Sequence, residues 1–317
     1  TIVPNKSLVT QTEEDFLACN LDTGVYYGDR KEVGRYNTIA TWQSLNVLEK
    51  KAKNEHSTEF KEFCNGIQTV IIDEVHMAKA DVLKRLLTGP FAHCGIRWGL
   101  TGTVPKADYE FMGLKCSIGE VANRIQASTL QDKGVLANCH VNVLQTQDHP
   151  QFKTYAEELK WLTTDTTRMT WVANTIKDIA TSGNTLILVD RISAGEMLEK
   201  KIKDSVFVSG STKNMDRKEQ YDEISTATNK VIIATYGVAA VGINIPRIFN
   251  LVLIEPGKSF VRVIQSIGRG IRKAEDKDSV QIWDITSSCK FAKRHLGARK
   301  KFYKEANYPY NIEKINY

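Results

Sequence analysis

Hydrophobic positions along the chain gather in short runs rich in valine and isoleucine, and each run ends in a polar or glycine-containing turn. Runs of this length without polar alternation are typical of parallel strands that are buried on both faces. We predict such strands at Thr69–Ile72, Thr185–Val189, 206–208, 231–234, 251–254 and 280–283. Residues 140–145 instead alternate between apolar and polar side chains, which indicates a strand with one exposed face.

Apolar residues recur at helical spacing between these runs. We predict helices at 78–87, 194–202, 215–224 and 260–271, and a long, mostly polar helix from about 151 to 182. Strands that alternate with helices favour an α/β fold with parallel sheets. Because the strands form two sets, we expect two domains, 1–128 and 129–317, with a connecting segment at the start of the second.

Composition narrows the class of protein but does not identify a partner. The 317 residues are 42% hydrophobic and 25% charged, which is ordinary for a globular protein. A formal net charge of +6 permits a polyanionic partner without requiring one. No apolar run is long enough to cross a membrane, so we expect no membrane partner and a cytoplasmic location. Six scattered cysteines without a C-x-x-C pair favour reduced thiols over a zinc site or disulfides.

The strongest local signal is a strand that ends in two adjacent carboxylates and a histidine, Asp73-Glu74-Val75-His76. Ligands of open α/β sheets bind beyond the carboxyl ends of the strands. One carboxylate together with substrate phosphates satisfies Mg²⁺, so Asp73 is a candidate metal ligand. Glu74 could accept a proton from an attacking water. The alternative is a strand end with two solvated acids and a helix-capping role.

Two further segments carry weaker signals. Arg269 and Arg272 share one face of a helix, and planar guanidinium groups suit bidentate contacts with phosphate oxygens. The alternative, a basic surface helix, is disfavoured by the two glycines in the same segment. After the strand at 231–234, small residues with Gly237 and Gly242 would let the backbone approach a ligand closely.

The order of these segments resembles that of the superfamily 2 helicases and translocases. Asp73–His76 resembles their motif II in the form of a DEVH box, and residues 101–103 resemble motif III. Similar matches are 2–8 to motif Ia, 41–45 to the T-W-Q segment, 186–192 to motif IV, 234–246 to motif V and 265–272 to motif VI. Within the family, the compact layout is most similar to the phage UvsW-type recombination and repair helicases.

The resemblance implies two RecA-like domains with parallel sheets flanked by helices, the first N-terminally incomplete, and ATP hydrolysis between them that drives movement on nucleic acid. The implied partner is branched or forked DNA with a single-stranded tracking strand. Asp73 would hold Mg²⁺, Glu74 would activate water, and Arg269 and Arg272 would stabilise charge on the γ-phosphate. The remaining implied nucleotide residues are the sensors His76 and Gln265 together with Gly242 and Asn244. The implied nucleic-acid contacts are Asn5, Lys6, Thr41, Trp42, Gln43, Ser209, Thr235, Tyr236 and Gly237.

Two departures from the family pattern matter. The 317 residues contain no G-x-x-x-x-G-K-[ST] loop, whose backbone amides and lysine cradle nucleotide phosphates. We therefore expect these residues to be the C-terminal portion of a longer protein and to hydrolyse no ATP alone. Asn244 stands where many relatives carry aspartate, so a charge is lost at that position.

Several alternatives stay open at this point. The motor could act on RNA or belong to a restriction enzyme, because contacts with the nucleic-acid backbone are alike in these cases. A non-catalytic nucleic-acid clamp is disfavoured by Asp73, Glu74 and the two arginines, which a clamp does not need. Trp42 could stack on a base or pack in the core. Residues 290–304 carry seven cations and no acid, so a helix there could contact phosphates or be a solvated face.

Overall fold

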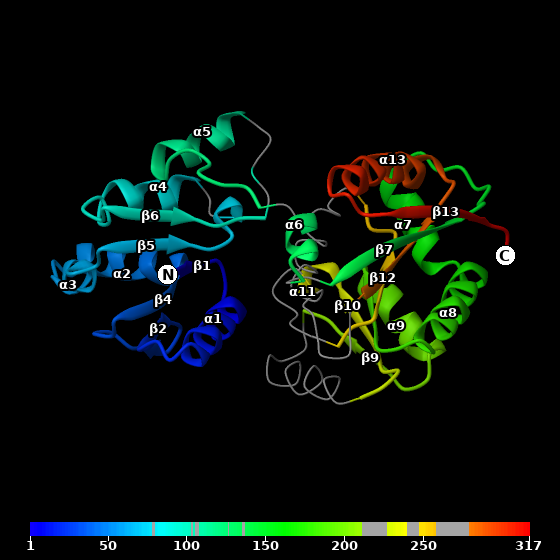
Figure 1. Cartoon of the computed structure of the whole chain (residues 1–317), viewed down its shortest axis with the longest axis horizontal. Coiled ribbons are helices and arrows are strands. Elements are labelled where there is room, and N and C mark those ends of the chain that lie inside the picture. The colour runs from blue at the N-terminus through cyan, green and yellow to red at the C-terminus, as the bar shows by residue number, and fades with distance from the viewer. Residues whose placement is uncertain are drawn as a thin grey trace. The chain divides into compact units, whose positions relative to one another are not determined.

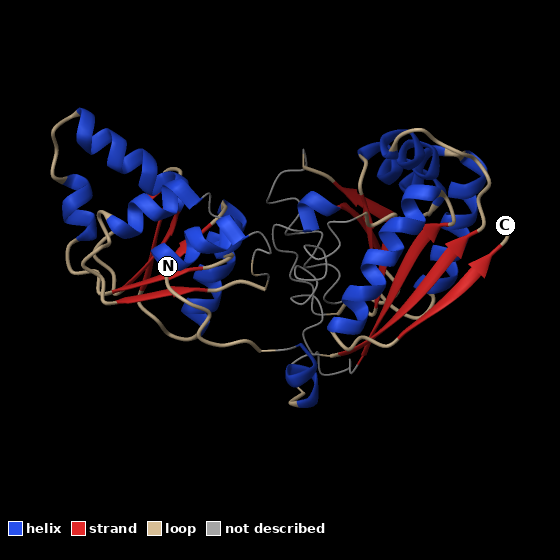
Figure 2. Ribbon diagram, turned by 90° about the horizontal axis from the view of Figure 1, so that it is seen from above, coloured by secondary structure: helices blue, strands red, loops and turns tan. Residues whose placement is uncertain are grey.

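The structure is a computed structural model that describes residues 1–77, 80–102, 104, 108–125, 127–134, 137–210, 227–239, 247–257 and 279–317. The chain divides into two compact units, Thr1–Arg124 and Ile125–Tyr317. Each unit contains a sheet with helices packed against it (Figures 1 and 2). Among the described residues, no helix combines the length and the apolar character that a membrane span needs. Because each unit combines a sheet of mainly parallel strands with helices, the predicted α/β class is confirmed.

The described strands of the first unit form a six-stranded sheet in the order β3-β2-β4-β1-β5-β6. Neighbouring strands are parallel except for the antiparallel pair β2–β3. The strands are β1 (Ile2–Val3), β2 (Thr23–Tyr27), β3 (Arg30–Lys31), β4 (Asn37–Thr41), β5 (Thr69–Ile72) and β6 (Ile96–Gly99). The helices are α1 (Lys6–Ala18), α2 (Trp42–Asn54), α3 (Glu59–Cys64), α4 (Ala80–Thr88) and α5 (Asp108–Ser117).

Two hydrophobic clusters hold the first unit together. In one, Leu8 and Val9 of α1 pack against Val25 and Ile39 of the sheet. The other joins α2, α4 and the strands β1 and β5 through side chains such as Leu45, Leu86 and Ile72. Covering a parallel sheet with helices is the usual way to bury its apolar side chains.

The described strands of the second unit form a seven-stranded, all-parallel sheet in the order β13-β7-β12-β11-β8-β10-β9. The strands are β7 (Asn138–Thr146), β8 (Thr185–Val189), β9 (Ser205–Val208), β10 (Val231–Thr235), β11 (Asn250–Ile254), β12 (Ser279–Ser287) and β13 (Tyr310–Ile315). The helices are α6 (Ala127–Asp132), α7 (Tyr155–Thr164), α8 (Thr166–Ala180), α9 (Ile192–Lys201), α11 (Tyr236–Ala239) and α13 (Lys290–Glu305).

Different helices cover the two faces of this second sheet. Met169 and Val172 of α8 and Leu198 of α9 belong to one hydrophobic cluster. Leu296 of α13 and Val238 of α11 belong to the other. Every residue of the central strands β8 and β11 is buried, which agrees with the unbroken apolar runs that predicted them.

The sequence-based helix boundaries agree less well with the structure. The single helix predicted from about 151 to 182 is wrong, because α7 ends and α8 begins at Asp165. Asp165 has extended backbone angles, and its carboxylate accepts a hydrogen bond from Arg168 N at 2.8 Å, as an N-cap does. The helix predicted at 78–87 begins later, as α4, after a 3₁₀ turn at Val75–Met77. The helices predicted at 215–224 and 260–271 lie outside the described residues.

Candidate functional site

The turns that follow four parallel strands of the first unit lie at one edge of its sheet. Strand register pairs Val3 of β1 with Thr41 of β4, and Ile72 of β5 with both Ile2 and Gly99. The residues that come next in each case belong to segments that the sequence marked as functional. Parallel pairing therefore gathers these segments at the carboxyl edge, where ligands of α/β sheets bind.

Asp73 and Glu74 begin the turn after β5. Asp73 N donates to Ile2 O at 2.9 Å, which extends the ladder between β5 and β1 by one bond. The Asp73 Oδ1 atom accepts from Glu74 N at 2.9 Å. Glu74 has a φ of 48°, in the left-handed region that side chains other than glycine rarely adopt. Such backbone conformations cost on the order of 1–3 kcal/mol and gather at functional sites.

His76 connects the turn after β5 with the turn after β6. His76 Nδ1 lies 2.7 Å from Thr101 Oγ1 and 3.4 Å from Glu74 Oε2. Val75 N donates to Leu100 O at 3.0 Å, which holds the two turns together through the backbone as well. Glu74 and His76 are both partly buried, with 21% and 17% of their side chains exposed. The segments that resemble motifs II and III thus form one hydrogen-bonded cluster.

The donors of this edge fit a Mg²⁺ ion that arrives with a phosphate ligand. Among the described residues there is no group of three or more His, Cys, Asp or Glu that could bind a metal by themselves. Mg²⁺ usually binds through one or two carboxylates, with water and substrate phosphates supplying the remaining oxygen ligands. A carboxylate such as that of Asp73, at the carboxyl end of a parallel strand, meets this requirement.

Two helices of the first unit start at the same edge. The Asn5 side chain caps α1 by accepting from Leu8 N at 3.0 Å, and Thr41 caps α2 by accepting from Ser44 N at 3.2 Å. Gln43 Nε2 donates to Pro4 O at 2.9 Å and so ties the two helix starts together. Helix N-termini attract anions such as phosphates. Asn5 and Thr41 were predicted as nucleic-acid contacts, and in this structure their side-chain oxygens serve the helix starts.

Of the other predicted contacts in the first unit, Trp42 is partly buried and packs against the core cluster that includes Leu45. This is the structural alternative that the sequence had left open. Lys6 and Gln43 are exposed. Their contacts with nucleic acid stay predictions from the sequence.

The predicted contacts of the second unit follow β9 and β10. Ser209 is buried, at 7% exposure, whereas Gly237 is exposed. Thr235 is partly buried. The Tyr236 hydroxyl donates to Ile254 O at 3.0 Å, and burial raises the pKa of this tyrosine well above its usual value. A contact from Tyr236 to a nucleic acid would therefore use its backbone rather than its hydroxyl.

The remaining predicted nucleotide residues lie outside the part of the chain that the structure describes. They are Gly242, Asn244, Gln265, Arg269 and Arg272. Thr103 of the segment similar to motif III also lies outside it. Their roles stay predictions from the sequence.

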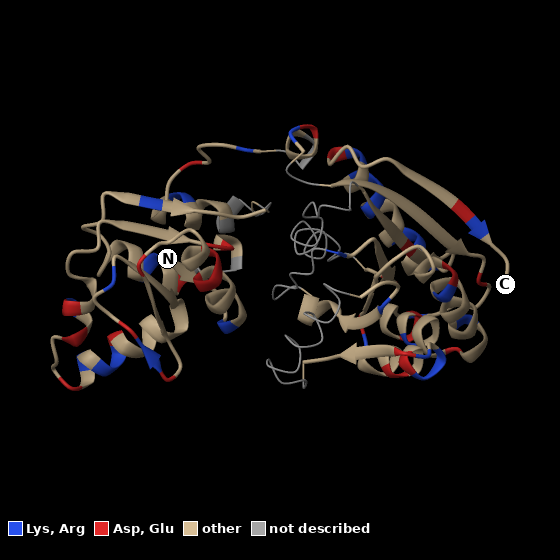
Figure 3. Cartoon of the chain, turned by 60° about the horizontal axis from the view of Figure 1, so that its bottom comes forward, with Lys and Arg blue, Asp and Glu red and all other residues tan. Residues whose placement is uncertain are grey.

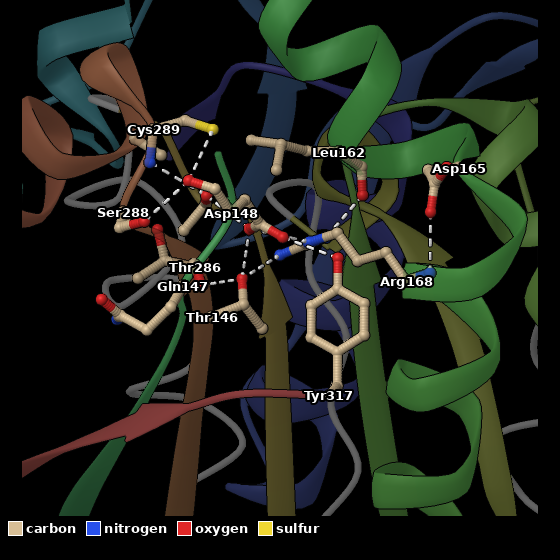
Figure 4. Close-up of polar contacts among 12 residues, drawn as sticks. Thr146, Gln147, Asp148, Leu162, Asp165, Arg168, Thr286, Ser288, Cys289 and Tyr317 are labelled. Atoms are coloured by element: carbon tan, nitrogen blue, oxygen red, sulfur yellow. Dashed lines mark hydrogen bonds and ion pairs between the residues drawn. The ribbon is translucent and has the colours of Figure 1, made fainter. Parts of the chain in front are cut away.

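Sequence reasoning missed a buried polar cluster at the carboxyl ends of β7 and β12 (Figure 4). Arg168 is fully buried and forms ion pairs with Glu255 at 2.7 Å and with Asp148 at 3.6 Å. Burial raises the pKa of Asp148, but hydrogen bonds from Ser287, Thr146 and Tyr317 outweigh this effect and lower it overall. This cluster fixes the turn after β7 to the start of α8.

Glu255 directly follows β11, as Asp73 directly follows β5. Burial raises the pKa of Glu255 to about 7, against the opposite influence of Arg168 and Arg299. Its φ is 44°, again in the left-handed region. The sequence signal at Asp73 was a strand that ends in two adjacent carboxylates and a histidine, and Glu255 shares only the acid directly after an apolar strand.

A second buried cluster joins α13 to the sheet. Arg299 forms two hydrogen bonds with the carboxylate of Asp284 on β12, at 2.8 and 2.9 Å, and Tyr303 Oη donates to the same carboxylate at 2.7 Å. Both residues of the ion pair are almost completely buried. The sequence had offered Arg299 as one member of a basic surface, and the structure corrects this because Arg299 faces inward.

Family models match both units of the chain. The model of the type III restriction enzyme res subunit matches residues 1–106, and the model of the helicase conserved C-terminal domain matches residues 167–274. The first match contains the described cluster of Asp73, Glu74, His76 and Thr101. The second contains the segments similar to motifs IV, V and VI.

Individual relatives agree with these matches. The chain is 25% identical to the ATP-dependent DNA helicase UvsW of Enterobacteria phage T4, over 95% of this chain and 62% of UvsW. It is 27% identical to putative helicase 22 of a Sulfolobus islandicus filamentous virus, over 74% of this chain and 45% of that protein. The chain therefore spans between two fifths and two thirds of the length of these curated relatives.

Solved structures show the same fold. The T4 UvsW structure matches with a TM-score of 0.50 and 21% identity, over 99% of this chain and 67% of that one. Dbp5 of S. cerevisiae, solved with RNA and ADP BeF3, matches with a TM-score of 0.65 and 15% identity, over 98% of this chain and 76% of that one. The two family matches and the similarity to UvsW support the resemblance of this chain to the superfamily 2 helicases, and to UvsW among them.

Proposed function

We propose that this chain is the motor portion of an ATP-dependent DNA helicase or branched-DNA translocase. The observation that carries the proposal is the cluster of Asp73, Glu74, His76 and Thr101 at the carboxyl edge of the first sheet. It joins the turns after two parallel strands through hydrogen bonds of side chains and backbone. The similarity to UvsW, a DNA helicase by name, supports DNA as the substrate.

In the proposed reaction, the side chains of the first unit bind the nucleotide and move a proton. Mg²⁺, when bound with ATP, would neutralise phosphate charge, and Asp73 is the residue that would hold it. Glu74 would accept the proton of the attacking water. Its left-handed backbone turns the residue away from the strand direction, and His76 lies 3.4 Å from its carboxylate. Thr101 fixes the imidazole of His76 from the neighbouring turn.

We also propose that Arg269 and Arg272 stabilise charge on the phosphates, with Gln265, Gly242 and Asn244 near the nucleotide. These roles rest on the sequence alone. The nucleic acid would meet the exposed Lys6 and Gln43 and the backbone amides at the starts of α1 and α2. It would also meet the segment from Thr235 to Gly237. Contacts of this kind bind the phosphate backbone without reading base sequence.

The proposed reaction needs a phosphate-binding loop that the 317 residues do not contain. The β6 edge of the first sheet offers a place for additional chain. Ile96 and Trp98 of this strand and Leu100 directly after it are 48%, 60% and 50% exposed, whereas parallel sheets are normally covered on both faces. The intact mass of the natural gene product tests whether the phosphate-binding loop can lie in the same polypeptide. A mass well above 35.7 kDa would allow the loop to lie in the same polypeptide, and an equal mass would favour a second polypeptide or a clamp.

The experiment that tests the function is ATP turnover by the full-length protein in the presence of forked DNA, linear duplex DNA and RNA. Stronger stimulation by forked DNA would support the proposal. Stimulation by linear duplex would favour a restriction-enzyme motor, which the match to the res subunit model also supports. Stimulation by RNA alone would favour an RNA helicase. Tight DNA binding without any turnover would favour the clamp and contradict the motor.

A further inference from the structure

The outer face of α13 is a row of cations. The exposed charged positions of this helix hold Lys290, Lys293, Arg294, Lys301 and Lys304, together with one acid, Glu305, at its last residue. One stripe along the helix consists of Lys290, Arg294, Gly297, Lys301 and Lys304, which are spaced by three or four residues. A side chain placed on Gly297 would meet no other atom within 4 Å, so the middle of the stripe is open. Figure 3 colours the Lys and Arg residues of the described chain blue and the Asp and Glu residues red.

The cations at the start of α13 do not serve the stability of the helix, whereas Lys304 in its last turn is favourable to the helix dipole. Cations in a first turn oppose the helix dipole, and α13 has no acidic residue there. Like charges at a spacing of four residues, such as Lys290 and Arg294, are also mildly destabilising. None of the five exposed cations forms an ion pair with a described residue. Lys290 and Arg294 do lie over the ring of Phe291, at 5.5 and 5.3 Å, which orients their side chains without neutralising them.

Other residues perform the structural work of α13. The buried carboxylate of Glu158 on α7 accepts hydrogen bonds from Phe291 N and Ala292 N, at 3.0 and 2.7 Å, and so caps the helix from outside. The inward-facing Arg299 fixes the middle of the helix to Asp284. The exposed cations are thus presented by a helix that is anchored at its start and at its centre.

The stripe has the length and rigidity of a duplex backbone contact. From residue 290 to residue 304 an α-helix rises about 21 Å, which corresponds to about six phosphates along one strand of B-DNA. The exposed positions of α13 carry no aromatic side chain, although aromatic stacking is what single-strand surfaces use. α13 also shares a hydrophobic cluster with Val238 and Ala239, next to the segment proposed to meet the tracking strand.

We propose that the outer face of α13 is a second nucleic-acid surface, which binds the phosphate backbone of a duplex arm. The inference rests on the proposed function, because it assumes that the second unit meets nucleic acid at all. It adds a contact that none of the motif segments supplies. Its effect would be to hold the duplex part of a forked substrate while the strand ends of the sheet meet the single-stranded part.

Charge reversal on this face tests the proposal. In the full-length protein, Arg294→Glu with Lys301→Glu should weaken binding of a labelled blunt duplex about tenfold at moderate salt. It should also reduce the slope of log K against log salt by about 2, since each phosphate contact contributes about 0.9. Binding of a labelled single strand of the same length should change less than threefold. The matched control is Lys200→Glu with Lys203→Glu, which gives the same change of charge at two exposed lysines, one in the last turn of α9 and one just after it.

The outcomes separate the inference from the proposed function. Unchanged duplex binding in the α13 variant, or an equal loss in the α9 control, overturns the inference even if forked DNA still stimulates ATP turnover. Loss of binding to phosphatidylserine vesicles with unchanged duplex binding would also overturn it. A wild-type protein that binds neither duplex nor single strand contradicts the proposed function itself. Circular dichroism checks that the variants fold. If the charge-reversal variant does not fold, it is replaced by Arg294→Gln with Lys301→Gln. This neutral variant is expected to weaken duplex binding about threefold.

Discussion

The imidazole of His76 and the hydroxyl of Thr101 meet at 2.7 Å, although 25 positions separate the two residues in the chain. One residue follows β5 and the other follows β6, so the contact exists only because these strands pair in parallel. It gives the turn after β5, where Asp73 and Glu74 lie, a physical link to the turn after β6. Movement of either turn would change the position of the imidazole beside Glu74.

We expect Thr101→Val to lower nucleic-acid-stimulated ATP turnover by about three- to tenfold, because a hydrogen bond of this kind contributes about 0.5–1.5 kcal/mol. Valine keeps the shape of threonine and removes only the hydroxyl. Steady-state kinetics should show a larger change in kcat than in the KM for ATP. Thr88→Val, at the exposed end of α4, is the control. A loss of similar size in both variants would argue against a role of the His76–Thr101 contact.

A second prediction concerns Glu74. The substitution Glu74→Gln keeps the size of the side chain and removes the carboxylate that would accept a proton from water. We expect steady-state ATP turnover to be abolished while DNA affinity stays within about twofold, since binding to phosphates does not use this group. The exposed Glu55→Gln on the same unit should turn over ATP normally. Normal turnover in Glu74→Gln would refute the assignment.

Much of the second sheet could be predicted from the sequence, because its central strands are unbroken apolar runs. The strands β8 and β11 are buried along their whole length and left a clear pattern. β1 contains only Ile2 and Val3, so it owes its place to pairing with β4 and β5 rather than to a local pattern. The break at Asp165 was missed because one residue both ends α7 and caps α8 within a continuous helical pattern.

The positions of the candidate residues were predictable where they follow strand ends. Asp73 was found because it follows an apolar run, and parallel pairing then explains why Thr101 lies nearby. Arg168 was missed because a charged residue on a helix is normally exposed. Its partner Glu255 lies 87 positions away, and no local pattern connects the two. Only the fold shows that this arginine is fully buried.

The pKa of Glu255 gives a prediction for pH dependence. Burial raises the pKa to about 7 from an ordinary value of 4.5. At a pH between these two values, the folded state therefore holds a proton that the unfolded state has lost. The contribution of Glu255 to stability is therefore present at low pH and is lost as the pH rises from about 4.5 to about 7. The melting temperature of the wild type, measured relative to that of Glu255→Gln, should fall across this range.

The amide in Glu255→Gln imitates the protonated acid and does not titrate, so the difference between the two proteins isolates this group. The size of the effect should be on the order of 1–3 kcal/mol. Glu313→Gln, an exposed acid on β13, should follow the wild type at every pH. A difference that is flat or rises with pH would show that Glu255 is ionised throughout, held in that state by Arg168.

The buried pair of Asp284 and Arg299 should be strongly coupled. Removing one partner leaves a buried charge without compensation, which costs about 3–5 kcal/mol. We expect Arg299→Met and Asp284→Leu each to lower the free energy of unfolding by about this amount, and the double variant to lose clearly less than the sum. Urea unfolding of the four proteins measures the coupling. Tyr303→Phe removes only one hydrogen bond to Asp284 and should cost about 1 kcal/mol. Additive losses in the cycle of Arg299→Met and Asp284→Leu would mean that α13 is held by apolar packing and not by this pair.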